Sequence, residues 1–153
     1  MRIEKENSRL GFKGQIVTNQ YDRLKEYCNT QELNVAQQTA LKIFVKYLTY
    51  YKSKNISSYT SSYGLKHRVE ELSERLVETV PGYKYEYIGN EDFIFAMLRN
   101  GFNCKNCGHG WDADRLGPNY FFNIKKLKKD WLQDPILELC VNEVFANETK
   151  YQS

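Results

Sequence analysis

The strongest constraint on the fold is an apolar stripe that recurs at helical spacing within residues 34–54. Its members are Leu41, Phe44, Val45, Leu48 and Tyr51. Asn34 stands before the stripe as a helix cap, and Gln37 follows three positions later, the spacing of a capping box. These features predict an amphipathic helix that ends near Lys54 and buries one face in a hydrophobic core.

Further stretches with helical periodicity predict that most of the chain is helical. They cover residues 18–28, 63–79 and 90–101, and Asn90 is the expected cap of the last. The segment after residue 124 predicts two more helical pieces, because Asp134 and Pro135 suit the cap and the first position of a new helix. The expected total is five to six helices.

Three short stretches favour strands instead. They are residues 14–17, the alternating stretch 84–88 and the aromatic stretch 120–124. The expected fold class is therefore α+β, mainly α-helical, with a small two- or three-stranded sheet. A winged-helix-like arrangement is one form that such a chain could take.

The expected domain organisation is a flexible or short-strand lead-in over residues 1–16 and one domain over 17–153. That domain divides into N-terminal helices (17–55), an α+β core (56–126) and C-terminal helices (127–153). A chain of 153 residues suits a single domain and is long enough to bury a core without disulfides.

The composition favours a globular protein that meets a partner. Hydrophobic residues make up 41% of the chain, which holds eight Phe and twelve Tyr. Tyrosines suit a binding surface, because their rings offer apolar area and their hydroxyls a polar group. The net charge of +3 permits nucleic acid as a partner without requiring it. Because the sequence shows no run of eighteen apolar residues and no apolar signal region, we expect a cytoplasmic protein that does not span a membrane.

The stretch CKNCGHGW, residues 104–111, is the clearest candidate for chemistry. A Cys-x-x-Cys turn followed by glycine resembles one half of a zinc ribbon, so Cys104, Cys107 and His109 are candidate ligands of one structural zinc. The fourth ligand would come from Cys28, Cys140, Asp112, Asp114 or a second chain.

Two alternatives to zinc stay open for this stretch. Cys28 and Cys140 each fall on the apolar stripe of an expected helix, where a cysteine is more often a small buried hydrophobic residue than a ligand. Residues 103–116 could therefore form a plain loop with reduced thiols. Catalytic thiol chemistry is the weaker alternative, since no second histidine is placed to activate a cysteine.

Two stretches combine aromatic and basic residues and are candidate binding surfaces. The first consists of Tyr59, Tyr63, Lys66, His67 and Arg68. His67 lies about 200° around its helix from Leu65, on the side away from the apolar stripe. This stretch has two interpretations. It is a contact surface, for a phosphate backbone or for an acidic patch on a protein, or it is the solvated face of a helix.

The second stretch consists of Lys125, Lys126, Lys128, Lys129 and Trp131. Aromatic residues interleaved with lysines are typical of a groove for nucleic acid. Two lysine pairs on an amphipathic helix are also typical of its solvated side. Both interpretations stay open.

Three stretches together resemble a group of small proteins of phages and mobile elements. They are SSYGLKHRVE (61–70), YIGNEDFIFAMLRNGF (87–102) and GPNYFFNIK (117–125), and the resemblance covers roughly residues 57–126. It implies a biological context and no catalytic residues. Small proteins of such elements often dock onto a host machine, and anti-CRISPR inhibitors are one such class.

The leading expectation is a non-enzymatic protein that docks onto a host nucleic-acid-handling protein or nucleoprotein complex, such as an RNA-guided nuclease, and inhibits it. A direct DNA- or RNA-binding regulator with a small zinc knuckle is the alternative. An enzyme that uses the cysteine stretch is a weaker third. The motifs G-x-G-x-x-G, H-E-x-x-H and G-x-S-x-G are missing from the sequence.

Overall fold

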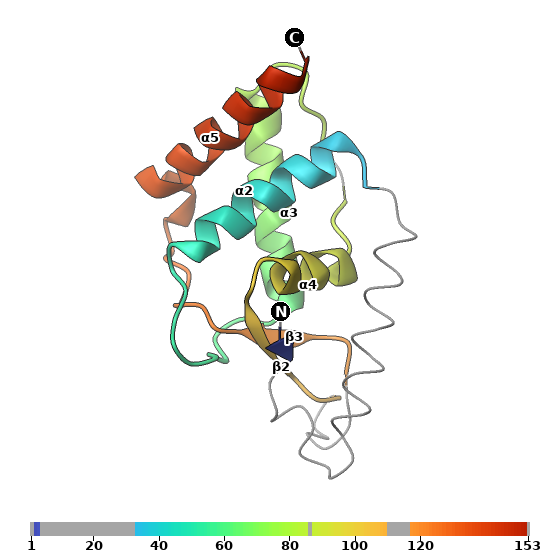
Figure 1. Ribbon diagram of the computed structural model, residues 1–153, viewed down its shortest axis with the longest axis vertical. Helices are drawn as coiled ribbons and strands as arrows, with labels where there is room; N and C mark the ends of the chain where they lie inside the picture. Colours follow the sequence, from blue (N-terminus) through green and yellow to red (C-terminus); the bar gives the residue numbers. More distant parts are fainter. Residues whose placement is uncertain (1, 4–32, 86, 110–116, 153) are drawn as a thin grey trace.

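The computed structural model describes residues 2–3, 33–85, 87–109 and 117–152 (Figure 1). Within them the chain forms the α-helices α2 (Val35–Thr49), α3 (Ser62–Thr79), α4 (Asn90–Arg99) and α5 (Pro135–Gln152), and a short 3₁₀ helix, η2 (Trp131–Gln133). The strands β1 (Arg2–Ile3), β2 (Asn103–Asn106) and β3 (Tyr120–Phe122) form one sheet in that order.

The predicted α+β, mainly helical class is confirmed. The described residues hold four α-helices, so they do not confirm five to six, and they do not confirm a winged helix. The helix expected at 18–28 and the strand expected at 14–17 lie outside the described residues. None of the described helices is both long and apolar enough to cross a membrane.

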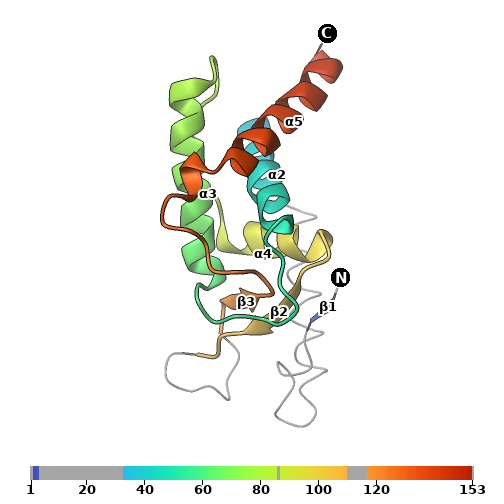
Figure 2. The ribbon, with the colours of Figure 1, turned by 90° about the vertical axis from the view of Figure 1, so that its left-hand side faces the viewer.

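Helix α2 is the centre of the helical part. It packs against α3, α4 and α5, and it crosses in front of α3 in Figure 1. The sheet lies at the end of the molecule away from the C-terminus, next to the first turns of α3 (Figure 2). The apolar stripe of α2 therefore faces a core to which all the other described helices contribute.

Phe44 of α2 shows how that core is packed. Its ring meets the Trp131 ring edge-on with centroids 5.3 Å apart, and the Phe93 ring at 6.0 Å. All three side chains are almost completely buried. Burial of an aromatic side chain of this kind contributes roughly 1.5–3 kcal/mol to folding, so these contacts account for much of the stability of the helical part.

The start of α2 agrees with the sequence, and its end does not. The Asn34 side chain accepts a hydrogen bond from the Gln37 N–H at 2.8 Å, and the Gln37 side chain accepts one from the Asn34 N–H at 2.9 Å. The predicted capping box is thus confirmed. The helix ends at Thr49 rather than near Lys54, because Lys52 pairs with Ile124 in an isolated β-bridge, which requires extended backbone.

Helices α3 and α4 begin at a serine and a glycine cap. The Ser61 side chain accepts from the Gly64 N–H at 3.5 Å, and α3 ends at Thr79, before Pro81 as predicted. Gly89, not Asn90, is the cap of α4. Asn90 instead donates its side-chain N–H groups to the Pro118 carbonyl and to the Asn119 side chain, at 3.1 and 3.0 Å. The predicted cap therefore serves as a tie between α4 and the turn before β3.

The sheet is only partly where the sequence predicted it. β3 confirms the first three residues of the expected strand 120–124, and it pairs antiparallel with β2, which was expected to be loop. β1 adds a short parallel pairing on the other side of β2. The strand expected at 84–88 is wrong for the residues described there, since the backbone N–H of Ile88 donates to the Glu70 side chain and not to a neighbouring strand.

The segment that follows β3 is a loop where a helix was expected. Residues 125–130 form no helix, and the N–H of Lys125 donates to the Tyr51 carbonyl at 2.8 Å. The boundary at Asp134 and Pro135 is confirmed, because α5 begins at Pro135. The Asp134 side chain accepts from the Ile136 N–H at 2.9 Å, as a cap does.

Candidate functional site

Exposed tyrosines gather beside the N-terminal half of α3. Tyr63 lies in the first turn of α3, and Tyr85 and Tyr87 lie in the segment that runs from α3 to α4. Their exposed fractions are 53%, 45% and 61%, high for aromatic side chains. The ammonium of Lys66 joins two of them, because it lies 5.5 Å from the Tyr63 ring centre and 4.3 Å from that of Tyr87. We call these three tyrosines, with Lys66 between them, the tyrosine face.

Lys66 is not the exposed contact residue that the sequence predicted. It is 4% exposed, and its ammonium is 3.4 Å from Glu70 Oε2. The same oxygen accepts the Ile88 N–H at 3.3 Å, and Glu70 Oε1 lies 2.8 Å from His67 Nδ1. Glu70 therefore ties the segment that carries Tyr85 and Tyr87 against α3. Lys66 is a structural cation that positions two rings.

The remaining charges of this face are also balanced. His67 meets the Tyr63 ring edge-on at 4.5 Å and its side chain is 40% exposed. Arg68 pairs with Glu71 at 2.9 Å. Burial, together with the nearby carboxylates of α3, raises the pKa of Tyr85, so that hydroxyl stays protonated at neutral pH. Of the first predicted surface, Tyr63, Lys66, His67 and Arg68 therefore lie together on α3, with the charges of Lys66 and Arg68 paired.

The second predicted surface is exposed as a loop, without its aromatic residue. Lys125, Lys126, Lys128 and Lys129 are all exposed, and we call them the lysine loop. Trp131 is 3% exposed and packs in the core, so its ring does not lie on the surface beside the lysines. The predicted groove, in which an aromatic ring stacks beside the lysines, does not form at Trp131.

Two lysines of the loop do meet other aromatic rings. The Lys126 ammonium lies 5.7 Å from the ring centre of Tyr59, which is 66% exposed. The Lys128 ammonium lies 5.3 Å from the ring centre of Tyr51 and 3.9 Å from Asp134 Oδ2. Tyr59 therefore belongs with the lysine loop rather than with the tyrosine face.

The two cysteines of CKNCGHGW differ in their surroundings. Cys104 lies in β2 opposite Phe122 and is completely buried in the core. Burial alternates from residue 103 to 107, so Cys107, half-buried just after the strand, lies on the opposite face. Burial raises the pKa of the Cys107 thiol to about 11, which disfavours the free thiolate that a nucleophilic mechanism needs.

A ligand set for zinc is not gathered within the described residues, where no three His, Cys, Asp or Glu side chains lie together. Cys140 is buried in α5, where burial raises its pKa to about 11. Cys28, Asp112 and Asp114 lie outside the described residues. The zinc hypothesis with Cys104, Cys107 and His109 stays a prediction, and the buried position of Cys104 in the strand does not favour it.

Asn106, which the sequence interpretation passed over, closes the base of this stretch. Its side-chain oxygen accepts from the N–H groups of Gly108 and Gly117, at 2.8 and 2.9 Å, and its amide donates to the Gly117 carbonyl at 2.9 Å. Gly108 has a positive φ of 85°, and a Cβ on Gly117 would lie 2.1 Å from the Gly108 carbonyl oxygen. Because only glycines can pass each other this closely, Gly108 and Gly117 were the feature of the sequence that could have predicted a closed turn.

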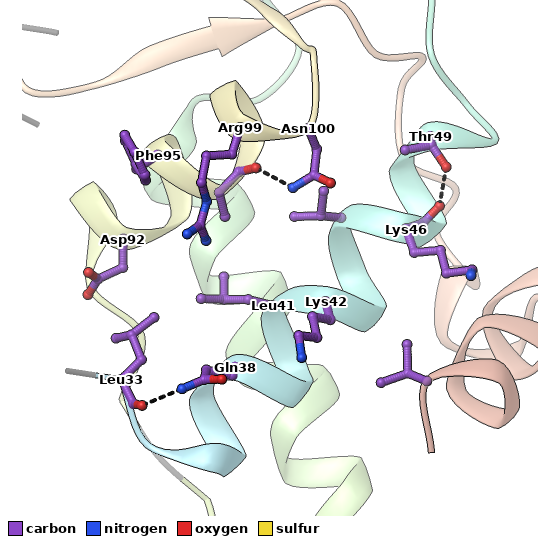
Figure 3. Close-up of a pocket in the computed structure, with 13 residues that line it drawn as sticks. Leu33, Gln38, Leu41, Lys42, Lys46, Thr49, Asp92, Phe95, Arg99 and Asn100 are labelled. Atoms are coloured by element: carbon purple, nitrogen blue, oxygen red, sulfur yellow. Dashed lines mark hydrogen bonds between the residues drawn. The ribbon is translucent and has the colours of Figure 1, made fainter. Parts of the chain in front are cut away.

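A cavity with a volume of about 910 Å³ opens between α2 and α4 (Figure 3). Its apolar lining residues are Leu33, Leu41, Val45, Phe95, Ala96 and Val144. Its charged lining residues are Lys42, Lys46, Asp92 and Arg99. No local pattern predicts this site, because its two walls come from helices that are about fifty residues apart in the chain.

Comparison of the chain with models of protein families, with curated proteins and with solved structures finds no match.

Proposed function

We propose that this chain is a non-enzymatic binding protein of a phage or mobile element. In this proposal it docks through the tyrosine face onto a host protein that handles nucleic acid, such as an RNA-guided nuclease, and inhibits it one to one. The observation that carries the proposal is the exposure of Tyr63, Tyr85 and Tyr87 around an immobilised Lys66. Exposed tyrosines of this kind are the residues that dominate the energetics of protein interfaces.

The balance of charge on this face favours a protein partner over a phosphate backbone. The centres of protein interfaces are depleted of unpaired charge, and here Lys66 and Arg68 pair with Glu70 and Glu71. Lys66 also holds the rings of Tyr63 and Tyr87 in place before binding. A partner would then lose less side-chain entropy on docking, which favours affinity.

The context of the proposal rests on the resemblance of residues 61–70, 87–102 and 117–125 to phage and mobile-element proteins. These stretches contribute to α3, α4 and β3, and α3 packs against both of the others. Tyr63 and Tyr87 both lie within them. The stretches that carry the resemblance therefore meet in one part of the fold and include two residues of the tyrosine face.

The proposal is tested by titrating the purified chain into DNA-cleavage reactions of a panel of RNA-guided nucleases. We expect cleavage by one of them to stop near one chain per nuclease. The triple variant Tyr63→Ser, Tyr85→Ser, Tyr87→Ser should weaken that inhibition about 100-fold or more, the scale of three interface residues that each contribute about 1 kcal/mol.

The matched control for this experiment is Tyr50→Ser. Tyr50 is 49% exposed at the end of α2, whereas the tyrosine face is tied to the start of α2 through the hydrogen bond from the Gln37 side chain to the Tyr87 carbonyl. The control should inhibit as the unchanged chain does. A panel without an inhibited nuclease, or equal inhibition by the triple variant, would contradict the proposal.

Direct binding of nucleic acid through the lysine loop is the second candidate, and the four exposed lysines favour it. Four phosphate contacts on a single strand predict that log K falls with log salt with a slope of about −3. Fluorescence anisotropy of labelled oligonucleotides at several salt concentrations measures that slope. Replacing the four lysines with glutamine should remove the binding, and a flat salt dependence would exclude this candidate.

The zinc knuckle attached to this second candidate is tested separately. Because Cys104 is a core residue, its substitution would destabilise the chain with or without zinc. Cys107→Ser is the informative variant, since Cys107 is half-buried. Zinc near one atom per chain in untagged protein, lost with Cys107→Ser, would support the knuckle. A ratio near zero in the unchanged chain would remove it.

A further inference from the structure

Tyr59 and the lysine loop form one surface, although they come from distant parts of the chain. The Ser57 N–H donates to the Phe122 carbonyl at 3.2 Å, and the Ser57 hydroxyl donates to the Ile124 carbonyl at 2.8 Å. Tyr59 follows shortly after Ser57, and the lysine loop begins directly after Ile124. These hydrogen bonds hold the two segments side by side, and the Lys126 ammonium lies 5.7 Å from the Tyr59 ring centre.

The Tyr59 ring is accessible to a ligand. It is 66% exposed, the largest exposed fraction among the described tyrosines. Tyr51, the other ring beside the lysine loop, is half-buried, and its hydroxyl donates to Asp134. Among the described residues, Tyr59 is therefore the aromatic side chain beside the lysine loop on which a planar group can stack.

The charges of the lysine loop are not neutralised within the described residues. Three of its four lysines form no ion pair there, and the fourth, Lys128, has only the contact with Asp134 at 3.9 Å. Asp130, which follows the loop, is exposed and is not paired with any of these lysines. An exposed ring and an excess of positive charge therefore lie together on this surface.

We infer that this surface binds single-stranded nucleic acid in preference to a duplex, with one base stacked on the Tyr59 ring and the neighbouring phosphates bound by the lysines. Such binding is the second candidate function, on which this inference rests, and Tyr59 is the residue that selects the single strand. Because base and phosphate belong to the same nucleotide, a base on Tyr59 brings its phosphate close to Lys126.

The physical basis of the preference is that stacking and charge favour different ligands. Every base has a flat face, so stacking on a tyrosine needs no particular sequence. A base inside a duplex is already paired and stacked, so it reaches the ring only at the cost of leaving the helix. The lysines alone favour the duplex, because its phosphates are more closely spaced than those of a single strand. A preference for the single strand is therefore the result that requires the ring.

The first test measures the fluorescence anisotropy of three labelled probes with the full chain. The probes are a thymidine strand, a uridine strand and a DNA duplex, each about twelve residues long, within the roughly 4–16 nucleotides that a single-strand groove covers. We expect at least one strand to bind about 5-fold or more tightly than the duplex, the effect of one stacked base. An equal or higher affinity for the duplex overturns the inference.

Variants of Tyr59 then test the ring itself. Tyr59→Ala should weaken binding of the strand about 5- to 100-fold, the range for the loss of one stacked ring, and leave binding of the duplex unchanged. Tyr59→Phe keeps the flat ring and should bind the strand as the unchanged chain does. Because the side chain is exposed, the melting temperature should change little in either variant. A loss with Tyr59→Phe as large as that with Tyr59→Ala would overturn the inference, because the hydroxyl rather than the ring would then bind the strand.

Tyr87 supplies the matched control. It is 61% exposed and also lies beside a lysine, with the Lys66 ammonium 4.3 Å from its ring centre, but that lysine is buried and paired with Glu70. Tyr87→Ala should therefore leave the affinity for the strand unchanged. An equal loss with Tyr87→Ala and Tyr59→Ala would contradict the assignment of the strand to the lysine loop.

The outcomes separate this inference from the two candidate functions. If Tyr59→Ala binds the strand as tightly as the unchanged chain, the inference fails, while a salt slope of about −3 would still support binding through the lysines. Absence of binding to all three probes would exclude both. Neither result bears on inhibition through the tyrosine face, because Tyr59 does not belong to it.

Discussion

The tyrosine face and the lysine loop both come from stretches that combine aromatic and basic residues. The fold exposes the aromatic residues of the first and the basic residues of the second. In the tyrosine face the rings of Tyr63 and Tyr87 are more than half exposed, while Lys66 is 4% exposed. In the lysine loop the lysines are exposed, while the neighbouring Trp131 is 3% exposed. Two stretches that look alike in composition therefore present different chemistry to a partner.

The available carboxylates explain the difference. A lysine can be buried only where an acidic group and hydrogen bonds compensate for the loss of water, and Glu70 supplies both one turn after Lys66. In the lysine loop the one ion pair among the described residues is the long contact of Lys128 with Asp134 at 3.9 Å. Trp131 instead finds its partners in Phe44 and Tyr47 of α2. The partners that each side chain finds, rather than the composition of the stretch, decide whether its aromatic or its basic residue is buried.

The largest effect expected from this comparison is on Trp131. Replacing it with alanine should lower the free energy of unfolding by about 3–5 kcal/mol, since the substitution removes a ring from the packed core. Tyr63→Ala should change it by about 0.5 kcal/mol or less, because its ring is exposed. Urea unfolding of the two variants measures the difference. Similar losses for both would mean that the two aromatic residues are not divided between core and surface.

The contrast also shows what the sequence could and could not predict. The stripe of α2 and its capping box were predicted correctly, because their spacing is local and strongly periodic. The same holds for the boundary at Asp134 and Pro135. Contacts within one or two helical turns join residues that are close together in the sequence, and such contacts define these elements.

Features that depend on distant partners were missed. The strand β2 was not predicted, because it forms by pairing with β3, where Cys104 lies opposite Phe122. The strand expected at 84–88 has the right alternation, but its Ile88 N–H is taken by Glu70. The cavity needed both α2 and α4 in place. Of the tyrosine face, only Tyr63 and Lys66 were among the predicted contact residues. Tyr85 and Tyr87 were missed, and so was the burial of Lys66.

The second largest effect is expected at Asp134, the acid that Lys128 of the lysine loop reaches. Asp134 Oδ2 accepts from the Tyr47 hydroxyl at 2.8 Å and also from the Tyr51 hydroxyl. Asp134→Ala should lower the free energy of unfolding by about 3 kcal/mol, because it leaves the buried Tyr47 hydroxyl without its acceptor and removes the cap of α5. Lys128→Gln should lower the free energy of unfolding by less than about 0.5 kcal/mol. The difference between the two variants shows whether this carboxylate stabilises the fold through the tyrosine hydroxyls or through Lys128.

The same carboxylate gives a pH dependence with a definite sign. The hydrogen bond from Tyr51, the largest cause, holds the pKa of Asp134 below its ordinary value. Stability from this group is therefore fully present above about pH 4, the unfolded value, and is lost as the pH falls through the lowered folded pKa. Unfolding free energies from pH 7 to pH 2 should converge for the unchanged chain and Asp134→Ala. Parallel curves would contradict this assignment.

A smaller effect is expected from the buried pair of the tyrosine face. Glu70→Gln should cost about 1–2 kcal/mol, because it leaves the buried Lys66 ammonium without its counter-charge. Lys66→Met should cost less, since methionine fills the space between the rings and Glu70 keeps His67 and the Ile88 N–H as partners. Thermal unfolding of both variants measures which substitution costs more stability. If Lys66→Met were the more damaging change, the lysine would be stabilising the face through more than its charge.

The smallest effect on stability is expected from the lysine loop itself. Replacing Lys125, Lys126, Lys128 and Lys129 with glutamine should change the free energy of unfolding by about 0.5 kcal/mol or less, because exposed charges with one long ion pair contribute little. Urea unfolding at low and at high salt measures this, and a loss of more than about 1 kcal/mol would show that the lysines support the fold. If stability is unchanged, the four lysine charges make no stabilising contact within the chain. Any effect of their removal on binding to an anionic polymer then reports on the surface alone, whereas Lys66 cannot be tested in that way because its charge is part of the structure.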